Sequence, residues 1–279
     1  MDLVICPSSP FLGKRISDFL GIKIANVQYK KFPDGEFYVR VESEEDKHVL
    51  VGSLISAKDI VLMNLLFDAL KGEIVAVIPY MGYARQDREF LKGEAVSIRA
   101  IAKMIEDRVE KVLTVNIHSN KAKEKFKKLV DLDAMPLIGE NFKGRDLVMI
   151  SPDKGSAERV KVAAKIANCD WDWLEKKRID AQTVEIAPKN LDVEGKNVLI
   201  LDDIISTGGT VVEATKKLYE LGAKRVETAC VHAVLADFAV IKLFSSGIAE
   251  ITATDTIERI FSKISVARIL TEEVKKIVF

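Results

Sequence analysis

Short apolar runs rich in β-branched residues alternate with amphipathic helical patterns along the chain. The run Val-Leu-Ile-Leu at 198–201 has no polar position, which is typical of a strand buried on both faces of a parallel sheet. After it, Val211, Ala214 and Leu218 lie three or four residues apart, the spacing of one helix face. The alternation predicts an α/β fold, with mostly parallel sheets flanked by helices. The expected strands are 3–6, 24–32, 37–41, 49–52, 74–78, 112–116, 147–150, 198–201, 226–231 and 250–253, and the expected helices are 11–20, 60–70, 97–105, 157–166, 210–221 and 239–245.

One strand–loop–helix–strand unit occurs twice, which favours two similar domains over one large sheet. The first copy starts at 73–78 and ends at His118, and the second starts at 197–201 and ends at His232. We place the joint in the polar, Gly-bearing segment 139–144, so that the expected domains are 1–142 and 143–279. The last residues, 271–279, are candidates for packing back on the first domain.

The composition narrows the class of protein. Of 279 residues, 48% are hydrophobic and 30% charged, which suits a globular chain and excludes a disordered one. Lys plus Arg and Asp plus Glu each number 42, so the chain lacks the surplus positive charge with which proteins hold a nucleic-acid backbone. No apolar stretch approaches the ~20 residues that cross a bilayer, and the three dispersed cysteines are typical of a reducing compartment. We therefore expect a cytoplasmic protein that binds neither nucleic acid nor membrane.

The segment 202–210, Asp-Asp-Ile-Ile-Ser-Thr-Gly-Gly-Thr, is the most informative part of the chain. Glycines let the backbone fold closely around an anion, and the first N–H groups of the following helix point at it. The two acids at the strand end can accept hydrogen bonds from vicinal sugar hydroxyls or from a hydrated Mg²⁺. Together these groups predict a sugar-phosphate site formed by Asp202, Asp203, Ser206, Thr207, Gly208, Gly209 and Thr210.

The alternative for this segment is an ordinary strand-to-helix turn with a Ser or Thr cap, which two adjacent acids after an apolar strand disfavour. Neither GxxxxGK[ST] nor GxGxxG occurs, so Walker-type ATPases and Rossmann dehydrogenases are also disfavoured. The segment resembles the phosphoribosyl pyrophosphate loop of the phosphoribosyltransferase fold. That loop does not separate enzymes that consume phosphoribosyl pyrophosphate from the synthetase that makes it.

Two segments of the first half carry groups suited to a nucleotide. In Phe-Pro-Asp-Gly-Glu at 32–36, an aromatic ring next to two carboxylates could stack on and read a purine, although a hairpin turn with a buried Phe is the simpler interpretation. The loop that follows the 73–78 strand ends in Arg-Gln-Asp-Arg at 85–88, and arginine grips phosphates bidentately. A solvated charged loop is the equally simple alternative there.

Two further features have modest specificity. His118 and Asp153 each follow a strand, and they could share one divalent cation between the domains, although a lone His at a strand end is more often structural. Lys176 and Arg178 lie in a basic run that leaves a strand, and a flexible Lys-x-Arg pair could neutralise charge on transferring phosphates. A basic surface turn is the alternative.

In this order the motifs closely resemble those of ribose-phosphate pyrophosphokinases. The likeness spans Phe-Pro-Asp-Gly-Glu, Pro-Tyr-Met-Gly-Tyr-Ala-Arg-Gln-Asp-Arg, Asn-Ile-His-Ser, Ser-Pro-Asp-Lys-Gly, Lys-Lys-Arg and the 202–210 loop, and it extends to 252–257. The resemblance implies two tandem phosphoribosyltransferase-like domains and transfer of the β,γ-diphosphoryl group of ATP to the C1 hydroxyl of ribose 5-phosphate. It further implies a Mg²⁺ requirement and a homo-oligomer, at least a dimer.

The same resemblance implies a role for each motif residue. Lys176 and Arg178 are expected in the catalytic flexible loop, His118 and Asp153 at the metal, and Asp202 and Asp203 on the ribose hydroxyls, with residues 206–210 around the 5-phosphate. The expected ATP-binding residues are Phe32, Asp34, Glu36, Arg85, Gln86, Asp87 and Arg88, with Glu36 also able to serve a neighbouring subunit's site. Such a transfer needs positioning and charge neutralisation but no covalent protein intermediate.

One departure from the family pattern is Ser206, where many members carry Asp. The hydroxyl removes a negative charge beside the sugar phosphate. Two other classes stay open: a salvage phosphoribosyltransferase, which has no need of the motifs at 32–36 and 85–88, and a regulatory relative without activity, which the presence of every catalytic motif disfavours.

Overall fold

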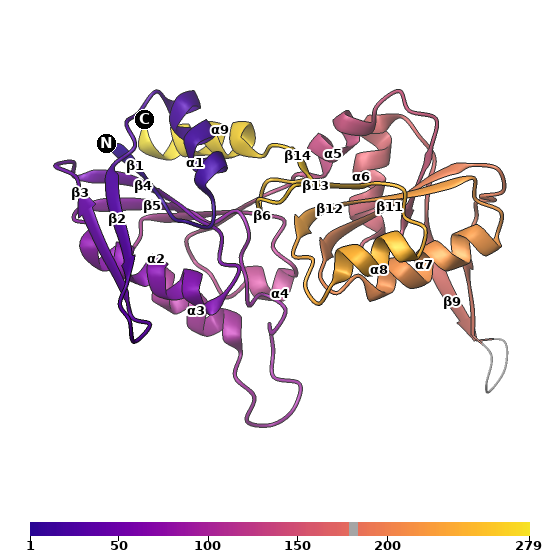
Figure 1. Cartoon of the computed structure of the whole chain (residues 1–279), viewed down its shortest axis with the longest axis horizontal. Coiled ribbons are helices and arrows are strands. Elements are labelled where there is room, and N and C mark those ends of the chain that lie inside the picture. Colours follow the sequence, from indigo (N-terminus) through magenta and orange to yellow (C-terminus); the bar gives the residue numbers. More distant parts are fainter. Residues whose placement is uncertain (179–183) are drawn as a thin grey trace. The chain divides into compact units, whose positions relative to one another are not determined.

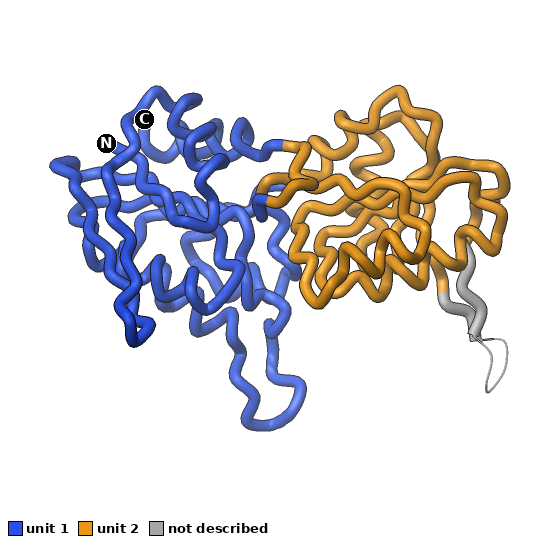
Figure 2. The backbone as a smooth tube through the Cα atoms, in the orientation of Figure 1, with its two compact units in different colours: residues 1–133, 256–258, 265–279 blue, residues 134–255, 259–264 orange. Residues whose placement is uncertain are grey.

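The computed structural model describes residues 1–178 and 184–279, with the side chains of 176–187 outside the described part. The chain forms two compact units (Figures 1 and 2). Unit 1 contains residues 1–133, 256–258 and 265–279, and unit 2 contains 134–255 and 259–264. No helix in the described residues is both long enough and apolar enough to cross a membrane.

Unit 1 is built on a five-stranded sheet whose strands are all parallel. Its order is β1 (Asp2–Ile5), β4 (Lys47–Val51), β5 (Glu73–Val77), β6 (Lys111–Val115) and β7 (Leu129–Leu132). The helices are α1 (Pro10–Leu20), α2 (Ala57–Ala69), α3 (Ser97–Glu106), α4 (Asn120–Lys123) and α9 (Ala267–Val278). The apolar residues of β4, β5 and β6 are buried, as their continuous hydrophobic runs predict.

A separate antiparallel hairpin of unit 1 consists of β2 (Asn26–Lys31) and β3 (Phe37–Glu42). Side chains such as Val27, Tyr29 and Val39 pack on the core of the unit, and the Tyr29 hydroxyl donates to the Ile5 carbonyl at 2.7 Å. These side chains alternate along the strands, so they lie on one face of the hairpin, and that face packs on the core.

Unit 2 has a seven-stranded sheet that is parallel except for the β9–β10 pair. Its order is β10 (Val184–Pro188), β9 (Trp171–Arg178), β8 (Val148–Ser151), β11 (Asn197–Ile205), β12 (Arg225–Ala233), β13 (Ile251–Thr254) and β14 (Ser262–Ile264). Helices α5 (Met135–Phe142) and α6 (Ala157–Ala167) pack together, as do α7 (Gly209–Glu220) and α8 (Ala239–Ser245) (Figure 1). The α/β class with parallel, helix-flanked sheets is confirmed.

The division between the units differs from the expected domains of 1–142 and 143–279. Helix α5 belongs to unit 2, which begins at Ala134, because it packs closely on α6. A Cβ on Gly139 would lie 2.4 Å from the carbonyl oxygen of Ala163, so the contact needs glycine. The expected boundary therefore comes several residues too late.

The end of the chain returns to unit 1. Helix α9 packs on α1 and buries Leu270 and Val274. Upstream, the Ser53 hydroxyl donates to the Thr256 carbonyl at 2.5 Å, and the Leu12 amide donates to Glu258 at 2.7 Å. Residues 271–279 thus lie on the first unit, where the sequence analysis placed them as candidates.

Candidate active site

The 202–210 segment has the expected strand–loop–helix geometry. Asp202 and Asp203 lie near the carboxyl end of β11, and α7 begins at Gly209 after the short turn 206–208. Gly208 has φ +77°, which favours glycine, and a Cβ there would approach Leu243 to 3.4 Å. The turn therefore brings the hydroxyls of 206, 207 and 210 and the first N–H groups of α7 to the strand end where ligands bind in parallel sheets.

Each acid at the end of β11 has its own side-chain partner. The Ser156 hydroxyl donates to Asp202 Oδ1 at 2.6 Å, and the Asp203 amide donates to the same oxygen at 2.8 Å. Asp203 is buried and forms an ion pair with Arg159. Burial and the neighbouring charge of Asp203 raise the pKa of Asp202 to about 7, against the lowering effect of the Ser156 hydroxyl.

Asp153 organises the turn that precedes α6. Its Oδ1 accepts hydrogen bonds from the amides of Gly155 and Ser156, at 2.7 and 3.2 Å. The Ser151 hydroxyl donates to the Asp153 carbonyl at 2.7 Å. Asp153 thus fixes the loop that carries Ser156, while its side chain stays exposed.

The 32–36 segment is the turn of the β2–β3 hairpin. The Phe32 amide donates to the Glu36 carbonyl at 2.8 Å, the Gly35 amide donates to the Phe32 carbonyl at 2.9 Å, and the Glu36 amide donates to Asp34 Oδ1 at 3.2 Å. The hairpin is as expected, but Phe32 is 49% exposed, so the alternative of a buried Phe is wrong. Its ring contacts only the edge of Tyr38 among the described aromatic pairs, at 6.2 Å between centroids.

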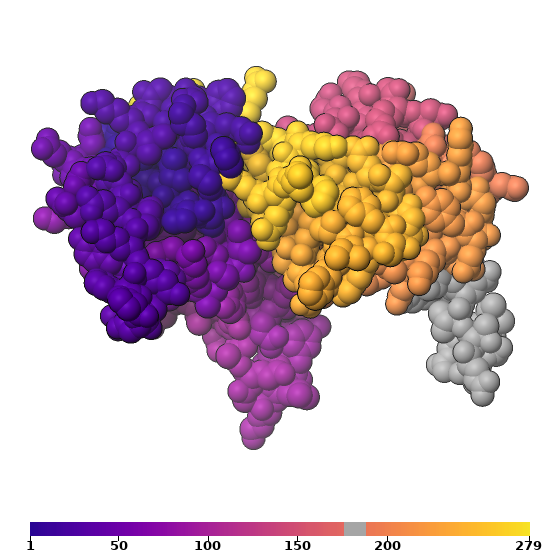
Figure 3. Space-filling model, viewed as in Figure 1, coloured from indigo at the N-terminus to yellow at the C-terminus, as the bar shows by residue number. Residues whose placement is uncertain are grey.

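The loop between β5 and α3 extends away from the body of unit 1 (Figures 1 and 3). Gln86 Nε2 donates to Glu94 Oε2 and to the Arg88 carbonyl, both at 3.2 Å. The Arg88 guanidinium lies 4.7 Å from the centroid of the Phe90 ring, and Arg85 is exposed. Both arginines thus remain at the surface, while Gln86 stabilises the loop.

Asp87 has a different environment from the other residues of 85–88. It is buried, and its Oδ2 accepts a hydrogen bond from the Ser119 hydroxyl at 2.5 Å. Ser119 also caps α4 by accepting the Ala122 amide at 3.1 Å. Asp87 therefore ties the loop to the segment that contains His118.

The half-buried His118 follows β6, and the neighbouring strand β7 brings two acids to the same segment. Asn116, with φ +40°, donates to Asp133 at 2.8 Å, and the Ile117 amide donates to Asp131 at 3.0 Å. These acids belong to no recognisable motif, and β7 is a strand that the sequence pattern does not predict. The only local signal was the alternation of apolar and acidic residues in Val-Asp-Leu-Asp at 130–133.

The cation proposed for His118 and Asp153 stays a prediction. His118 belongs to unit 1 and Asp153 to unit 2. Across residues 1–178 and 184–279, no cluster of three or more His, Cys, Asp or Glu side chains is arranged to hold a metal ion.

The backbone of Lys176 and Arg178 continues β9, opposite Ile186 and Val184 of β10. The sequence pattern predicts that the chain leaves a strand here, whereas the strand extends to Arg178. The side chains of both residues lie outside the described part, so their catalytic role remains a prediction.

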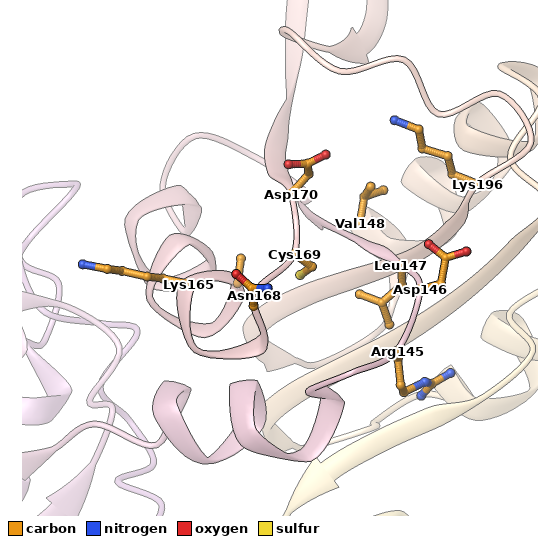
Figure 4. Close-up of a pocket in the computed structure, with 10 residues that line it drawn as sticks. Arg145, Asp146, Leu147, Val148, Lys165, Asn168, Cys169, Asp170 and Lys196 are labelled. Carbon is orange, nitrogen blue, oxygen red and sulfur yellow. The ribbon is translucent and has the colours of Figure 1, made fainter.

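A cavity of about 490 Å³ lies at the amino ends of the unit 2 strands, the end of the sheet opposite to Asp202 and Asp203 (Figure 4). Leu147 and Val148 line it from the start of β8, Lys196 from the residue before β11, and Cys169 from the turn after α6. It is separate from the carboxyl ends of the strands, where the candidate residues of this unit lie.

Known proteins resemble this chain over most of its length. The family model described as the N-terminal domain of ribose phosphate pyrophosphokinase matches residues 1–108, and the phosphoribosyl transferase domain matches 117–242. Ribose-phosphate pyrophosphokinase 2 of Archaeoglobus fulgidus is 58% identical over 274 residues, which are 98% of this chain and 100% of that protein. Ribose-phosphate pyrophosphokinase of Methanosarcina acetivorans is 40% identical over 285 residues, 99% and 100% of the two chains.

Among solved structures, phosphoribosylpyrophosphate synthetase from Mycobacterium smegmatis matches with a TM-score of 0.82 at 25% identity, covering 99% of this chain and 98% of that one. The chain has parallel sheets flanked by helices, and strand β11 carries two adjacent acids ahead of a Gly-rich turn. These features define an α/β protein of the phosphoribosyltransferase type. Within that class, the chain belongs to the ribose-phosphate pyrophosphokinase family.

Proposed function

We propose that the protein transfers the β,γ-diphosphoryl group of ATP to ribose 5-phosphate. The C1 hydroxyl oxygen bonds to the β-phosphorus, the bond from that phosphorus to the α–β bridging oxygen breaks, and the hydroxyl proton is released. The products are phosphoribosyl pyrophosphate and AMP. The observation that carries the proposal is the pair Asp202 and Asp203 near the end of β11, shortly before a Gly-rich turn and the start of α7.

Each part of this site has a role that its chemistry supports. The turn 206–210 and the first amides of α7 would hold the 5-phosphate, and the twin acids would accept the ribose hydroxyls. Phe32 would stack on adenine with Asp34 and Glu36 beside it, and the 85–88 loop would contact the phosphates. Lys176 and Arg178 would neutralise charge that develops during transfer.

No nucleophilic side chain is needed, and the cysteines are poorly suited to be one. Burial raises the pKa of the Cys6 and Cys230 thiols well above its ordinary value. The three cysteines are unpaired, which supports a cytoplasmic location.

Mg²⁺ fits the donor chemistry of Asp153. The ion binds through one or two carboxylates, several waters and substrate phosphates. Asp153 is exposed, and its hydrogen bonds in the described residues use Oδ1, so Oδ2 is available. Together with His118 it would hold the ion, which supplies positive charge to the phosphate groups when bound.

AMP formation from ATP and ribose 5-phosphate tests the proposal. The purified chain should release AMP and phosphoribosyl pyrophosphate in equal amounts, and only with both substrates present. A salvage transferase would instead consume phosphoribosyl pyrophosphate with a base, and a regulatory relative would do neither. Absence of AMP from folded protein with Mg²⁺ would refute the proposal.

Size-exclusion chromatography with light scattering tests the accompanying proposal of a homo-oligomer.

A further inference from the structure

The two acids of β11 are held from one place, the start of α6. Ser156 and Arg159 are three residues apart, so they lie on the same face of the first turn of that helix. Ser156 reaches Asp202 at 2.6 Å, and Arg159 reaches Asp203. One helix end therefore contacts both acids through two different side chains.

The arrangement solves an electrostatic problem. Asp203 is 5% exposed and adjacent to a second carboxylate, and a buried charge is unfavourable unless it is paired. Arg159 supplies the opposite charge, and its side chain is itself only 31% exposed. The Ile204 amide donates to Asp203 Oδ1 at 3.0 Å, so both oxygens of Asp203 are held.

In the described residues, the Ser156 hydroxyl and the Asp203 amide converge on one oxygen of Asp202, Oδ1. Two donors on one oxygen fix the plane of the carboxylate, so that its oxygens face a ligand hydroxyl in a set direction. The two acids therefore differ in environment. Both oxygens of Asp203 have partners and its charge is paired with Arg159, whereas Asp202 is a hydrogen-bond acceptor whose orientation is fixed by its partners.

We propose that Ser156 and Arg159 are positioning residues that set the selectivity for a pentose bearing adjacent 2- and 3-hydroxyls. This inference rests on the proposed function and deepens it. A site built to bind a hydroxyl rejects an analogue that lacks it, but only while its acceptors are rigidly placed. The enzyme therefore discriminates against 2-deoxyribose 5-phosphate through residues that do not touch the sugar.

The test compares ribose 5-phosphate with 2-deoxyribose 5-phosphate in variants at the two positions. Arg159→Met should raise KM for ribose 5-phosphate about ten- to hundredfold, the effect of losing a hydrogen bond to a charged group, with kcat and KM for ATP little changed. The ratio of kcat/KM between the two sugars should fall by a similar factor. Ser156→Ala should change both quantities in the same direction by a smaller factor, because the Asp203 amide still holds Asp202.

Conservative variants separate positioning from folding. Ser156→Thr keeps the hydroxyl and should recover wild-type selectivity, and Arg159→Lys keeps the charge but not the planar fork and should be intermediate. Lys161→Met is the matched control, since it removes one cation from the same helix, where Lys161 pairs only with the exposed Glu158 among described acids. Displacement of the helix end alone would weaken both sugars equally and leave the ratio unchanged.

Calorimetric titration with ribose 5-phosphate alone gives a readout that is independent of turnover. Weaker binding in Arg159→Met than in Lys161→Met supports the inference even if the wild-type chain forms no AMP, which would refute the proposed function by itself. Folded Arg159→Lys and Ser156→Ala proteins with wild-type affinity and a wild-type sugar ratio would overturn it.

Discussion

The candidate sugar-phosphate residues of unit 2 and the candidate nucleotide residues of unit 1 are held in different ways. In unit 2, Asp202 and Asp203 are bonded to the side chains of Ser156 and Arg159. In unit 1, Phe32 is 49% exposed on a hairpin turn closed by main-chain hydrogen bonds. The arginines of 85–88 also remain exposed.

The difference follows from the chemistry of the groups. Two adjacent, partly desolvated carboxylates repel each other and must be fixed and neutralised before any ligand arrives. An exposed aromatic ring or guanidinium has no such cost in the free protein, and it can be ordered by the ligand itself. We therefore expect substitutions in unit 2 to change stability and activity together, and those at the surface of unit 1 to change activity alone.

The largest effect is expected at the Lys-x-Arg pair, which belongs to unit 2 but is the expected exception to its rule, because its proposed role is to neutralise transferring phosphates rather than to hold a buried carboxylate. Lys176→Ala or Arg178→Ala should lower kcat about 10²- to 10³-fold, because the lost charge acts on the transition state, with the melting temperature unchanged. Steady-state kinetics and thermal unfolding measure the two quantities. The control is Lys189→Ala, whose ammonium lies 4.6 Å from the centroid of the Trp173 ring. Turnover within about threefold of wild type would remove the pair from the catalytic group.

Asp202→Asn tests the expected conflict between stability and binding. The folded protein holds a proton on Asp202 with a pKa of about 7, above the ordinary value of 3.8, so folding stability falls as pH rises from about 4 to 7. An uncharged amide avoids that loss, and the variant should be about 1–3 kcal/mol more stable than wild type at pH 8, with little gain at pH 4. Its affinity for ribose 5-phosphate should fall.

Urea unfolding at pH 8, 6 and 4 measures this trend, with Asp192→Asn as the control. Asp192 is an exposed acid of the same unit whose Oδ1 accepts the Glu194 amide at 3.0 Å. A gain in stability that did not depend on pH would show that the strain at Asp202 is not electrostatic.

Local pattern was sufficient for much of the fold and for the conformation of the 202–210 loop. The apolar run at 198–201 and the glycines that follow act within a few residues of each other, and they predict β11, the turn and α7, although β11 continues four residues beyond its expected end, to Ile205. The same is true of the hairpin around residues 32–36. These features depend on local sequence, which a single chain contains in full.

Other parts depend on contacts between distant segments. Strand β7 has four residues and, among the described strands, pairs with β6 alone, so its own sequence carries little signal. Helix α5 joins unit 2 through the close approach of Gly139 to α6, which no local pattern encodes. The pairing of Arg159 with Asp203 spans 44 residues and requires β8 beside β11, so these partners could not be read from either segment alone.

Phe32→Ala tests the expectation that surface substitutions in unit 1 change activity and leave stability unchanged. Loss of a stacking ring should raise KM for ATP about tenfold, since base stacking contributes roughly 1–3 kcal/mol, while KM for ribose 5-phosphate stays unchanged. The melting temperature should also stay unchanged because the ring is largely outside the core. Phe32→Tyr should restore the affinity, and Phe19→Ala, at another exposed ring of unit 1, is the control. A clear loss of stability in Phe32→Ala would contradict the rule for this unit.

The smallest effect concerns an acid of unit 2 whose neighbours fully compensate it. Glu227 in β12 is buried and accepts hydrogen bonds from Arg145 at 2.8 and 2.9 Å and from Arg225 at 2.7 Å. Burial alone would raise the pKa of Glu227, but the two guanidinium groups outweigh it and hold the pKa below its ordinary value. The sign is therefore opposite to that of Asp202: Glu227 contributes stability above its ordinary pKa and loses it as pH falls through the lowered value.

Glu227→Gln should cost about 1 kcal/mol at pH 7, because both arginines are half-exposed and remain hydrated when the charge is removed. The cost should shrink below about pH 4, as the wild-type carboxyl becomes protonated. Glu220→Gln, at an exposed acid that pairs with Lys217 at 3.1 Å, should cost less at every pH. Urea unfolding of both variants between pH 3 and 7 measures the difference. If Glu227→Gln lost no more stability than Glu220→Gln, pairing with arginine would not be what separates Glu227 from Asp202, and the charge of Asp203 beside Asp202 would be the remaining difference.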